Sequence, residues 1–229
     1  MGTSIEIAHR IHRKLGDPRD PTSFSSRCRA IRFREFLRCF PDLDSMRVLD
    51  LGGTPGYWHG APVRPAHVTT VNLDDFDPGA PWVEHVIADA CDPGTLDRCA
   101  GGYDLVVSNS LIEHVGGYQR RRELAEVARA AAPACWVQTP DRHFPVEPHY
   151  VGPMFQFLPL RLRAKVVRNW PLNHVPVHTS DAALEQVLTI ELISATELRH
   201  LFPGATVWHE RLLGMSKSIV AIRTATERN

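Results

Sequence analysis

Short apolar runs that end in polar or glycine-rich turns recur along the chain. Five of them are residues 48–51, 67–74, 86–87, 103–110 and 134–139. Between these runs lie segments such as 25–40 and 118–132, in which apolar residues recur at three- and four-residue steps. Runs that alternate with helical segments are typical of a parallel sheet covered by helices. The arginines at 120–122 are expected on the solvated face of their helix.

The last part of the chain has a different pattern. Residues 206–210 and 217–222 alternate in the manner of two strands, and they are separated by a short turn. Upstream of them, Ser194 and Glu197 have the spacing of a capping box, which predicts that a helix begins there. We therefore expect an antiparallel pair of strands to complete the sheet.

The first apolar run ends in an acidic residue and a glycine-rich turn, R-V-L-D-L-G-G-T-P-G-Y-W over residues 47–58. Glycines let a ligand approach the main chain and accept its N–H donors, as nucleoside and dinucleotide sites require. The nicotinamide fingerprint G-x-G-x-x-G fails here, because Thr54 stands at its third position. Asp50 would repel a pyrophosphate, but it suits a ligand that carries an ammonium and a sulfonium.

Two segments resemble motifs of class I S-adenosylmethionine-dependent methyltransferases of the type 11 kind. Residues 48–56, V-L-D-L-G-G-T-P-G, resemble the first motif, and residues 103–115, Y-D-L-V-V-S-N-S-L-I-E-H-V, resemble the fourth. The middle glycine of the family pattern is Thr54 here. The resemblance implies an α/β, Rossmann-like, three-layer sandwich with a mostly parallel seven-stranded sheet and an antiparallel C-terminal strand. It also implies S-adenosyl-L-methionine as cofactor and S-adenosyl-L-homocysteine as product.

The resemblance further implies which residues hold this cofactor. Asn72 aligns with the family's ribose-binding acid, and Asp74 lies on the same face of its strand. Asp89 is expected to receive the adenine amino group, and the alternative for it is a turn or helix-capping role. The expected cofactor-binding set is Asp50, Gly52, Gly53, Thr54, Gly56, Asn72, Leu73, Asp74, Asp89, Ala90, Ser108 and Asn109.

Three histidines are candidate catalytic residues. Methyl transfer to a hydroxyl is helped by a general base, and a histidine side chain titrates near neutral pH. His114 follows the fourth strand, whereas His143 and His149 lie in a proline-rich loop after the fifth. The alternative for His114 is that it caps the next helix or contacts the cofactor. The alternative for His143 and His149 is a hydrogen-bonded surface histidine. Together with Glu113 and Glu147 the three histidines would also allow a divalent-metal site, but their spacing matches no compact ligand motif, so no metal is expected.

The chain is expected to form an N-terminal arm with a cap helix, residues 1–46, and a methyltransferase domain, residues 47–229. Within that domain, residues 141–180 are expected to be a substrate-facing loop and lid insertion. Residues 155–170 combine large apolar groups with four cations and no acid. One side of this stripe is expected in the core and the other in solvent; the alternative is that it holds a lipid-like or anionic acceptor or makes peripheral contact with a membrane.

The overall composition narrows the function. The 26 basic and 26 acidic residues cancel, so the chain has no general attraction to nucleic acid or to an anionic membrane. The five cysteines lack C-x-x-C spacing, which argues against a disulfide framework or a structural zinc site and favours a cytoplasmic protein. No uncharged run reaches membrane-spanning length, and Ser110 follows Asn109 where nucleic-acid amino-methyltransferases have proline.

The leading interpretation is methyl transfer from S-adenosylmethionine to a small-molecule or glycolipid acceptor. Oxygen is preferred as the acceptor atom because of the histidines. One alternative is a module that binds the cofactor without activity, which the departures at Thr54 and Asn72 keep open. The other is an NAD(P)-dependent reductase.

Overall fold

The structure is a computed structural model of the chain, and it describes residues 24–150, 152–170, 177 and 179–225. The chain forms two compact units, each of which is described by itself. The sheet unit consists of Phe40–Phe144 and Thr189–Asn229, and the helical unit of Met1–Cys39 and Pro145–Leu188. Residues 1–23 of the expected N-terminal arm lie outside the described residues.

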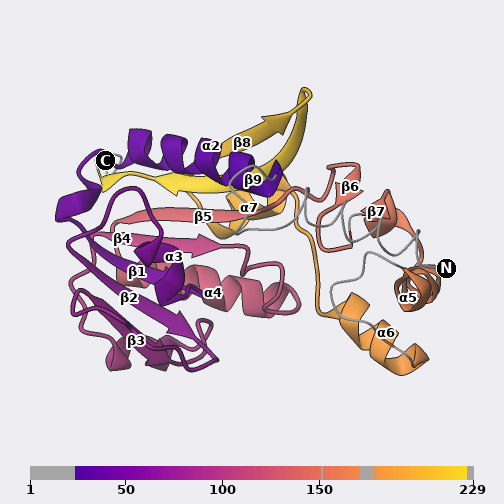
Figure 1. The fold of residues 1–229 in the computed structure, drawn as a ribbon, viewed down its shortest axis with the longest axis horizontal. Helices are drawn as coiled ribbons and strands as arrows, with labels where there is room; N and C mark the ends of the chain where they lie inside the picture. Colours follow the sequence, from indigo (N-terminus) through magenta and orange to yellow (C-terminus); the bar gives the residue numbers. More distant parts are fainter. Residues whose placement is uncertain (1–23, 151, 171–176, 178, 226–229) are drawn as a thin grey trace. The chain divides into compact units, whose positions relative to one another are not determined.

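A seven-stranded sheet forms the centre of the sheet unit (Figure 1). Its strands are β1 (Arg47–Leu51), β2 (His67–Asn72), β3 (Val83–Ile87), β4 (Leu105–Asn109), β5 (Ala134–Pro140), β8 (Thr206–Leu212) and β9 (Met215–Arg223). They lie in the order β3-β2-β1-β4-β5-β9-β8. The first five pair in parallel, whereas β9 runs antiparallel to both β5 and β8. The predicted mostly parallel sheet with an antiparallel C-terminal strand is confirmed.

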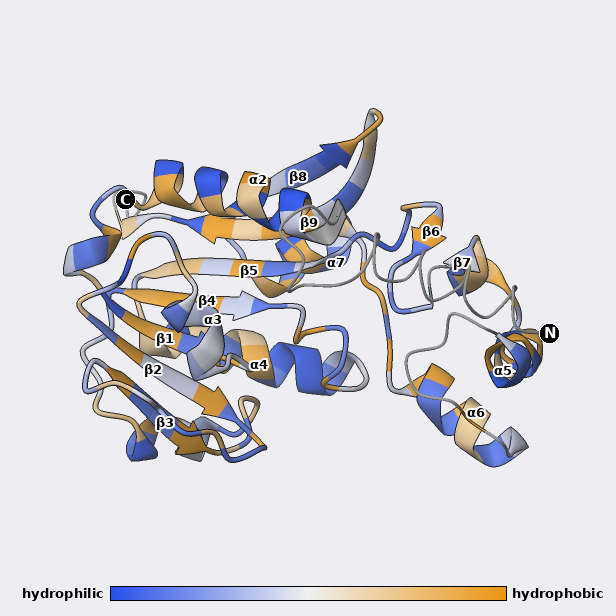
Figure 2. Ribbon diagram, in the orientation of Figure 1, coloured by the Kyte–Doolittle hydropathy of each residue, from blue (hydrophilic) through white to orange (hydrophobic). Residues whose placement is uncertain are grey.

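Burial along the strands explains this order. In β4, Leu105, Val106 and Val107 are all buried, so both faces of the central strand are covered, as parallel sheets require. Hydrophobic colour follows the central strands, whereas the edge strand β8 is mainly hydrophilic (Figure 2). Only Glu210 of β8 is buried. The strands β1, β2 and β4, whose C-terminal ends carry the candidate site, are therefore mostly buried.

Short helices and one long helix accompany the sheet. They are η1 (Leu43–Ser45), α3 (Pro55–His59), η2 (Pro93–Arg98), α4 (Tyr118–Ala131) and α7 (Ala195–Leu201). Leu124 of α4 and Leu198 of α7 are buried in the same hydrophobic core. As predicted from the capping box, Ser194 precedes α7, and its hydroxyl accepts a hydrogen bond from the Glu197 N–H at 3.2 Å.

The helical unit contains α2 (Phe24–Cys39), a hairpin of β6 (Val146–Glu147) and β7 (Gly152–Pro153), η3 (Phe155–Phe157), α5 (Leu160–Asn169) and α6 (Ser180–Leu188). The helical pattern over residues 155–170 is interrupted, because Pro159 separates η3 from α5. None of the described helices is long and apolar enough to cross a membrane. The sequence-based division at residues 46 and 141–180 stays a prediction.

Arg121 differs from the expectation that all three arginines of α4 face solvent. Its side chain is only 9% exposed. Its Nε donates to Glu197 at 2.8 Å, and its Nη1 donates to Glu191 at 2.5 Å. Arg121 thus ties α4 to α7 and to the segment that precedes α7. The neighbouring Arg122 forms an exposed ion pair with Glu126.

We expect Arg121→Ala to lower the free energy of unfolding by about 2–4 kcal/mol, because two carboxylates lose a largely buried partner. Arg122→Ala, the matched control, is expected to change it by less than about 0.5 kcal/mol. Urea unfolding followed by circular dichroism measures both values. Equal effects of the two substitutions would show that Arg121 does not hold the helices together.

Candidate active site

The glycine-rich loop after β1 is a tight turn that only glycine fits at its first position. Gly52 has a φ of +78°, and a β-carbon there would come within 2.8 Å of the Leu111 side chain. The Gly52 N–H donates to the Val71 carbonyl at 2.8 Å. Because β2 and the chain after β4 both approach this residue, the loop is confined from two sides.

Asp50 lies beneath the loop and is 2% exposed. A β-carbon on Gly53 would come within 1.9 Å of the Asp50 carboxylate, so the main chain passes directly over it. The Trp58 Nε1–H donates to Asp50 Oδ2 at 2.8 Å. Burial raises the pKa of Asp50 to about 7, although the hydrogen bond from Trp58 opposes the rise. A cation beside the loop would favour the ionised carboxylate.

Asn72, at the end of β2, holds the same loop. Its Nδ2 donates to the carbonyls of Gly52 and Gly53, at 3.2 Å each, and its Oδ1 accepts from the Asp74 N–H at 3.2 Å. An aspartate has no proton to donate to two carbonyls, which explains an amide at this position. The neighbouring Leu73 is 72% exposed, and Asp74 is exposed as well.

Space is left beside the start of α3, which follows the loop. Gly56 lies in the first turn of α3, and a β-carbon there would meet no other described residue within 4 Å, apart from its chain neighbours and the backbone of its own helix. Thr54 precedes α3 in an extended conformation, and its hydroxyl makes no capping hydrogen bond. The predicted contacts of Thr54 and Gly56 with a cofactor stay predictions.

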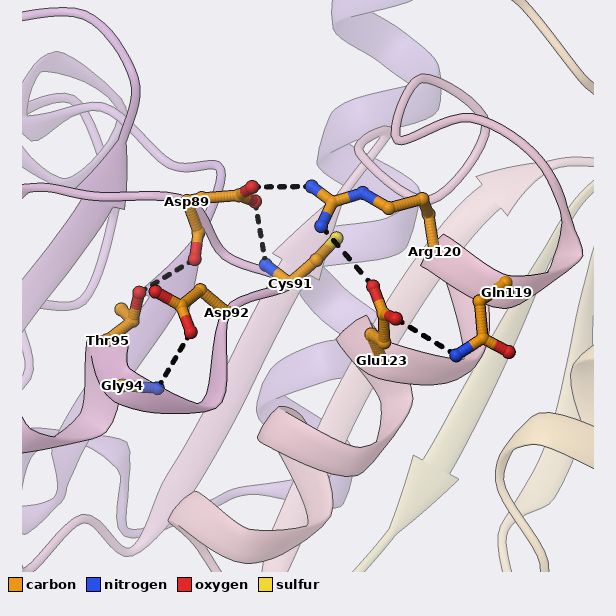
Figure 3. A network of polar contacts seen from close by, with 8 residues as sticks. All are labelled: Asp89, Cys91, Asp92, Gly94, Thr95, Gln119, Arg120 and Glu123. Atoms are coloured by element: carbon orange, nitrogen blue, oxygen red, sulfur yellow. Dashed lines mark hydrogen bonds and ion pairs between the residues drawn. The ribbon is translucent and has the colours of Figure 1, made fainter.

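Asp89, after β3, is the centre of a polar network (Figure 3). Its Oδ1 accepts from the Cys91 N–H at 2.9 Å, its Oδ2 binds Arg120 Nη2 at 2.5 Å, and its carbonyl accepts from the Thr95 hydroxyl at 2.7 Å. Burial raises the pKa of Asp89, but the bonds from Cys91 and Arg120 outweigh it, and the net shift is downward. Asp89 therefore stabilises the turn after β3 and binds the first turn of α4 through Arg120. The adenine contact, like that of buried Ala90, stays a prediction.

The end of β4 turns sharply at Ser110. The buried Ser108 hydroxyl donates to the Leu51 carbonyl at 2.9 Å, which links β4 to the end of β1. Ser110 has a φ of +52°, a left-handed conformation that costs energy in a residue other than glycine. Its N–H donates to the Gln138 carbonyl at 2.9 Å. The preceding Asn109 is partly exposed at the strand end.

His114 follows a buried carboxylate. Glu113 is fully buried, and its Oε2 accepts from the Thr139 hydroxyl at 2.9 Å. The Glu113 carbonyl accepts from the Glu191 N–H at 2.8 Å. The next residue, His114, is exposed, and its N–H donates to the Leu111 carbonyl at 2.7 Å. The anchored Glu113 thus fixes the main chain from which His114 projects.

His143 is oriented by Asp141, which the sequence reasoning did not single out. Asp141 is 4% exposed, and its Oδ1 accepts from the His143 N–H at 2.9 Å. The same oxygen lies 3.4 Å from His143 Nδ1, and Oδ2 lies 4.0 Å from His209 Nδ1. The imidazole of His143 is exposed, with one edge beside the carboxylate. The only signal in the sequence was an acid two residues before the histidine.

His149 belongs to the helical unit. Its Nδ1 bonds to Glu147 Oε1 at 2.6 Å, and Glu147 Oε2 accepts from the Tyr150 N–H at 2.8 Å. The five candidate metal ligands are divided between the two units. Glu113, His114 and His143 belong to the sheet unit, and Glu147 and His149 belong to the helical unit. These contacts test neither the catalytic role of the histidines nor the expectation that no metal binds.

Comparison with solved structures gives a shared fold. NodS from Bradyrhizobium japonicum WM9, an N-methyltransferase in complex with S-adenosyl-L-homocysteine, aligns with a TM-score of 0.54 at 11% identity over 95% of this chain and 97% of that one. The DhpI complex with the same ligand gives 0.52 at 15% identity, over 96% and 94%. A putative zinc-dependent alcohol dehydrogenase from Rhodobacter sphaeroides gives 0.53 at 14% identity, over 84% and 87%. No protein-family model and no curated protein sequence matches the chain.

The chain has the class I methyltransferase fold. The sheet order β3-β2-β1-β4-β5-β9-β8, with the last strand of the sequence antiparallel between β5 and β8, sets it apart from the all-parallel order of dinucleotide-binding domains. The predicted resemblance is confirmed at the level of the fold. The identities are too low to carry over a substrate or a residue role.

The raised pKa of Asp50 predicts a pH dependence of stability. Asp50 titrates near 7 in the folded chain and at 3.8 without burial, so between these values the folded state binds the proton more tightly. Wild-type stability should therefore fall from pH 4 to pH 7 relative to Asp50→Asn, which carries no charge there. Urea midpoints at pH 5 and pH 8 measure the difference. The exposed Asp97→Asn is the control, and parallel pH profiles for wild type and Asp50→Asn would contradict the assignment.

Replacing Asn72 by aspartate should loosen the glycine loop. The carboxylate would face the carbonyls of Gly52 and Gly53 without a proton to donate, so we expect a loss of about 1–3 kcal/mol in unfolding free energy. Asp74→Asn, two residues away and exposed, should leave stability within about 0.5 kcal/mol. Urea unfolding of the two variants decides. A stability gain in Asn72→Asp would mean that the two hydrogen bonds from the Asn72 amide do not stabilise the loop.

Proposed function

We propose that the chain is an S-adenosylmethionine-dependent methyltransferase that acts on a small-molecule or lipid-like acceptor, with oxygen as the acceptor atom. The observation that carries this proposal is the buried Asp50 beneath a glycine loop at the end of β1. Structures of this fold such as NodS and DhpI are described with S-adenosyl-L-homocysteine bound. A cytoplasmic location belongs to the same proposal.

The residues at the loop fit such a cofactor. S-adenosylmethionine supplies an electrophilic methyl group on a sulfonium, and it carries an ammonium as well. Asp50, with a pKa near neutrality, is available to balance positive charge. The open space beside Gly56 leaves room at the main chain. Because the Asn72 amide already binds the loop, exposed Asp74 is the better candidate for the ribose hydroxyls.

The remaining predicted residues complete the cofactor site. Gly52 and Gly53 present the main chain, Ser108 and Asn109 lie at the end of the neighbouring strand, and Leu73 and Ala90 flank the nucleoside side. Asp89 would accept a hydrogen bond from the adenine amino group in place of the one from Arg120. Each of these roles belongs to the proposal.

The acceptor hydroxyl needs a group that takes its proton. For His143, the Asp141 carboxylate beside Nδ1 favours a proton on that nitrogen and leaves Nε2 as the acceptor. Glu147 does the same for His149 within the helical unit. His114, at the end of β4, is the third candidate. We assign no metal to this chemistry.

A lipid-like acceptor has support in the helical unit. Met154, Phe157 and Leu162 are between 44% and 52% exposed, and the cation Arg161 is exposed beside them in sequence. Apolar side chains mixed with cations are typical of surfaces that meet lipid headgroups. Peripheral membrane contact through residues 155–170 is therefore part of the proposal.

A binding module without activity is the second candidate. Asn72 is committed to the loop and Thr54 replaces a family glycine, so two family contacts are altered. An NAD(P)-dependent reductase has less support. The chain lacks the G-x-G-x-x-G fingerprint, although it shares its fold with a protein described as an alcohol dehydrogenase.

Calorimetric titration with S-adenosyl-L-homocysteine and with NADH or NADPH tests the cofactor, and incubation with methyl-labelled S-adenosylmethionine and a panel of hydroxylated metabolites tests transfer. We expect binding of the adenosyl ligand and label on an acceptor. Binding without transfer would favour the module, and exclusive binding of a nicotinamide dinucleotide would favour the reductase.

Substitution of the histidines identifies the base. Removal of a general base typically costs about 10²–10⁴-fold in kcat, so one of His114→Gln, His143→Gln and His149→Gln should show this loss while its affinity for S-adenosyl-L-homocysteine stays unchanged. His200→Gln, exposed on α7, is the control. Full activity in all three variants would remove the histidines from the mechanism.

A further inference from the structure

A groove of about 400 Å³ lies between α5 and α6 of the helical unit. The two helices are in contact, and Val167 of α5 and Ala183 and Val187 of α6 are buried. Ala164 of α5 and Leu184 of α6 contribute apolar surface to the groove. Its volume falls in the range of small-molecule sites, about 300–1,000 Å³.

Three cations of α5 line this groove, Arg161, Lys165 and Arg168. They are four and three residues apart, so they follow one side of the helix. The Arg168 Nη1 donates to the Ser180 hydroxyl of α6 at 3.1 Å. No acidic residue occurs in α5, and Asp181 is the one acid among the lining residues. The described lining therefore carries an excess of two positive charges.

Several other cations of the described chain form ion pairs. Arg38 binds Glu35 at 2.7 Å, Arg120 binds Asp89 at 2.5 Å, and Arg122 binds Glu126 at 3.0 Å. Within residues 24–150, 152–170 and 179–225, none of the three groove cations forms an ion pair with an acid, even though Asp181 shares the lining. Three cations that line one cavity repel one another, and a bound anion would relieve that repulsion.

We propose that this groove binds a small anionic amphiphile. A phosphate or carboxylate group would contact Arg161, Lys165 and Arg168, because guanidinium and ammonium groups donate charge-assisted hydrogen bonds to such oxygens. A short apolar portion would contact Ala164 and Leu184. The concave, mixed lining favours a single small molecule over an extended membrane or nucleic-acid surface. This site does not depend on whether the chain transfers methyl groups.

Calorimetry on the full chain with monomeric n-octyl phosphate tests the site. We expect binding that weakens as salt is added, at least about tenfold weaker binding of uncharged n-octyl glucoside, and at least about tenfold weaker binding of octyl phosphate to Lys165→Glu. In that variant the new acid lies four residues from Arg161 and three from Arg168, so ion pairs along the helix preserve α5. Lys165→Gln should give an intermediate loss, and Arg199→Glu, the same charge change on α7, should give none.

Four outcomes would overturn the proposal. The first is that wild type and Lys165→Glu bind octyl phosphate with equal affinity. The second is that wild type binds octyl phosphate and octyl glucoside equally, and the third is that it binds octyl phosphate and inorganic phosphate equally. The fourth is that wild type binds only to phosphatidylglycerol vesicles. The second would mean an apolar surface only, the third a bare anion site and the fourth a membrane surface. Circular dichroism at the helical minima confirms that each variant keeps its fold.

Discussion

The burial of Asp50 is the constraint on which the candidate site depends. A carboxylate taken out of water without a cationic partner is costly, and the chain meets this cost by raising the pKa of Asp50 to about 7. The Trp58 N–H satisfies one of its oxygens, which places α3 against the loop. Gly53 must lack a side chain because the carboxylate fills the space beneath it. The buried carboxylate of Asp50 therefore determines three features: the glycine at position 53, the position of α3 and the orientation of the Trp58 side chain.

Neighbouring strands then fix the loop from outside. Asn72 holds it from β2, Leu111 leaves no room for a side chain at Gly52, and the Ser108 hydroxyl binds the last carbonyl of β1. These contacts exist only because β1 lies between β2 and β4 in the sheet. The shape of the loop therefore depends on the order of the strands, because residues of β2 and of the chain at the end of β4 hold it in place. The proposed donor site in turn depends on the fold.

Sequence reasoning predicted the strands because each is a continuous apolar run, as in Leu105 to Val107, and it predicted α7 from the spacing of Ser194 and Glu197. It could not predict contacts that join distant residues. In the sequence Arg121 is like its two arginine neighbours, yet it is buried and pairs with Glu191 and Glu197, which lie 70 and 76 residues later. Likewise, the role of Asn72 as a clamp depends on where two carbonyls point, which no pattern of residue types encodes.

Asp89 shows how structural and proposed functional roles meet on one carboxylate. Oδ1 is committed to the Cys91 N–H, which sets the turn after β3, so an adenine amino group would compete with Arg120 for Oδ2. Glu123 already lies 3.3 Å from Arg120 Nη1 and would retain the guanidinium after displacement. The pair with Glu123 would therefore partly offset the loss of the ion pair between Arg120 and Asp89. Both of these side chains are about 40% exposed, so water screens their attraction and the energetic cost of separating them is small. Under the proposed cofactor role, adenine binding is coupled to the first turn of α4, which makes Arg120 the residue through which the nucleoside and that helix influence each other.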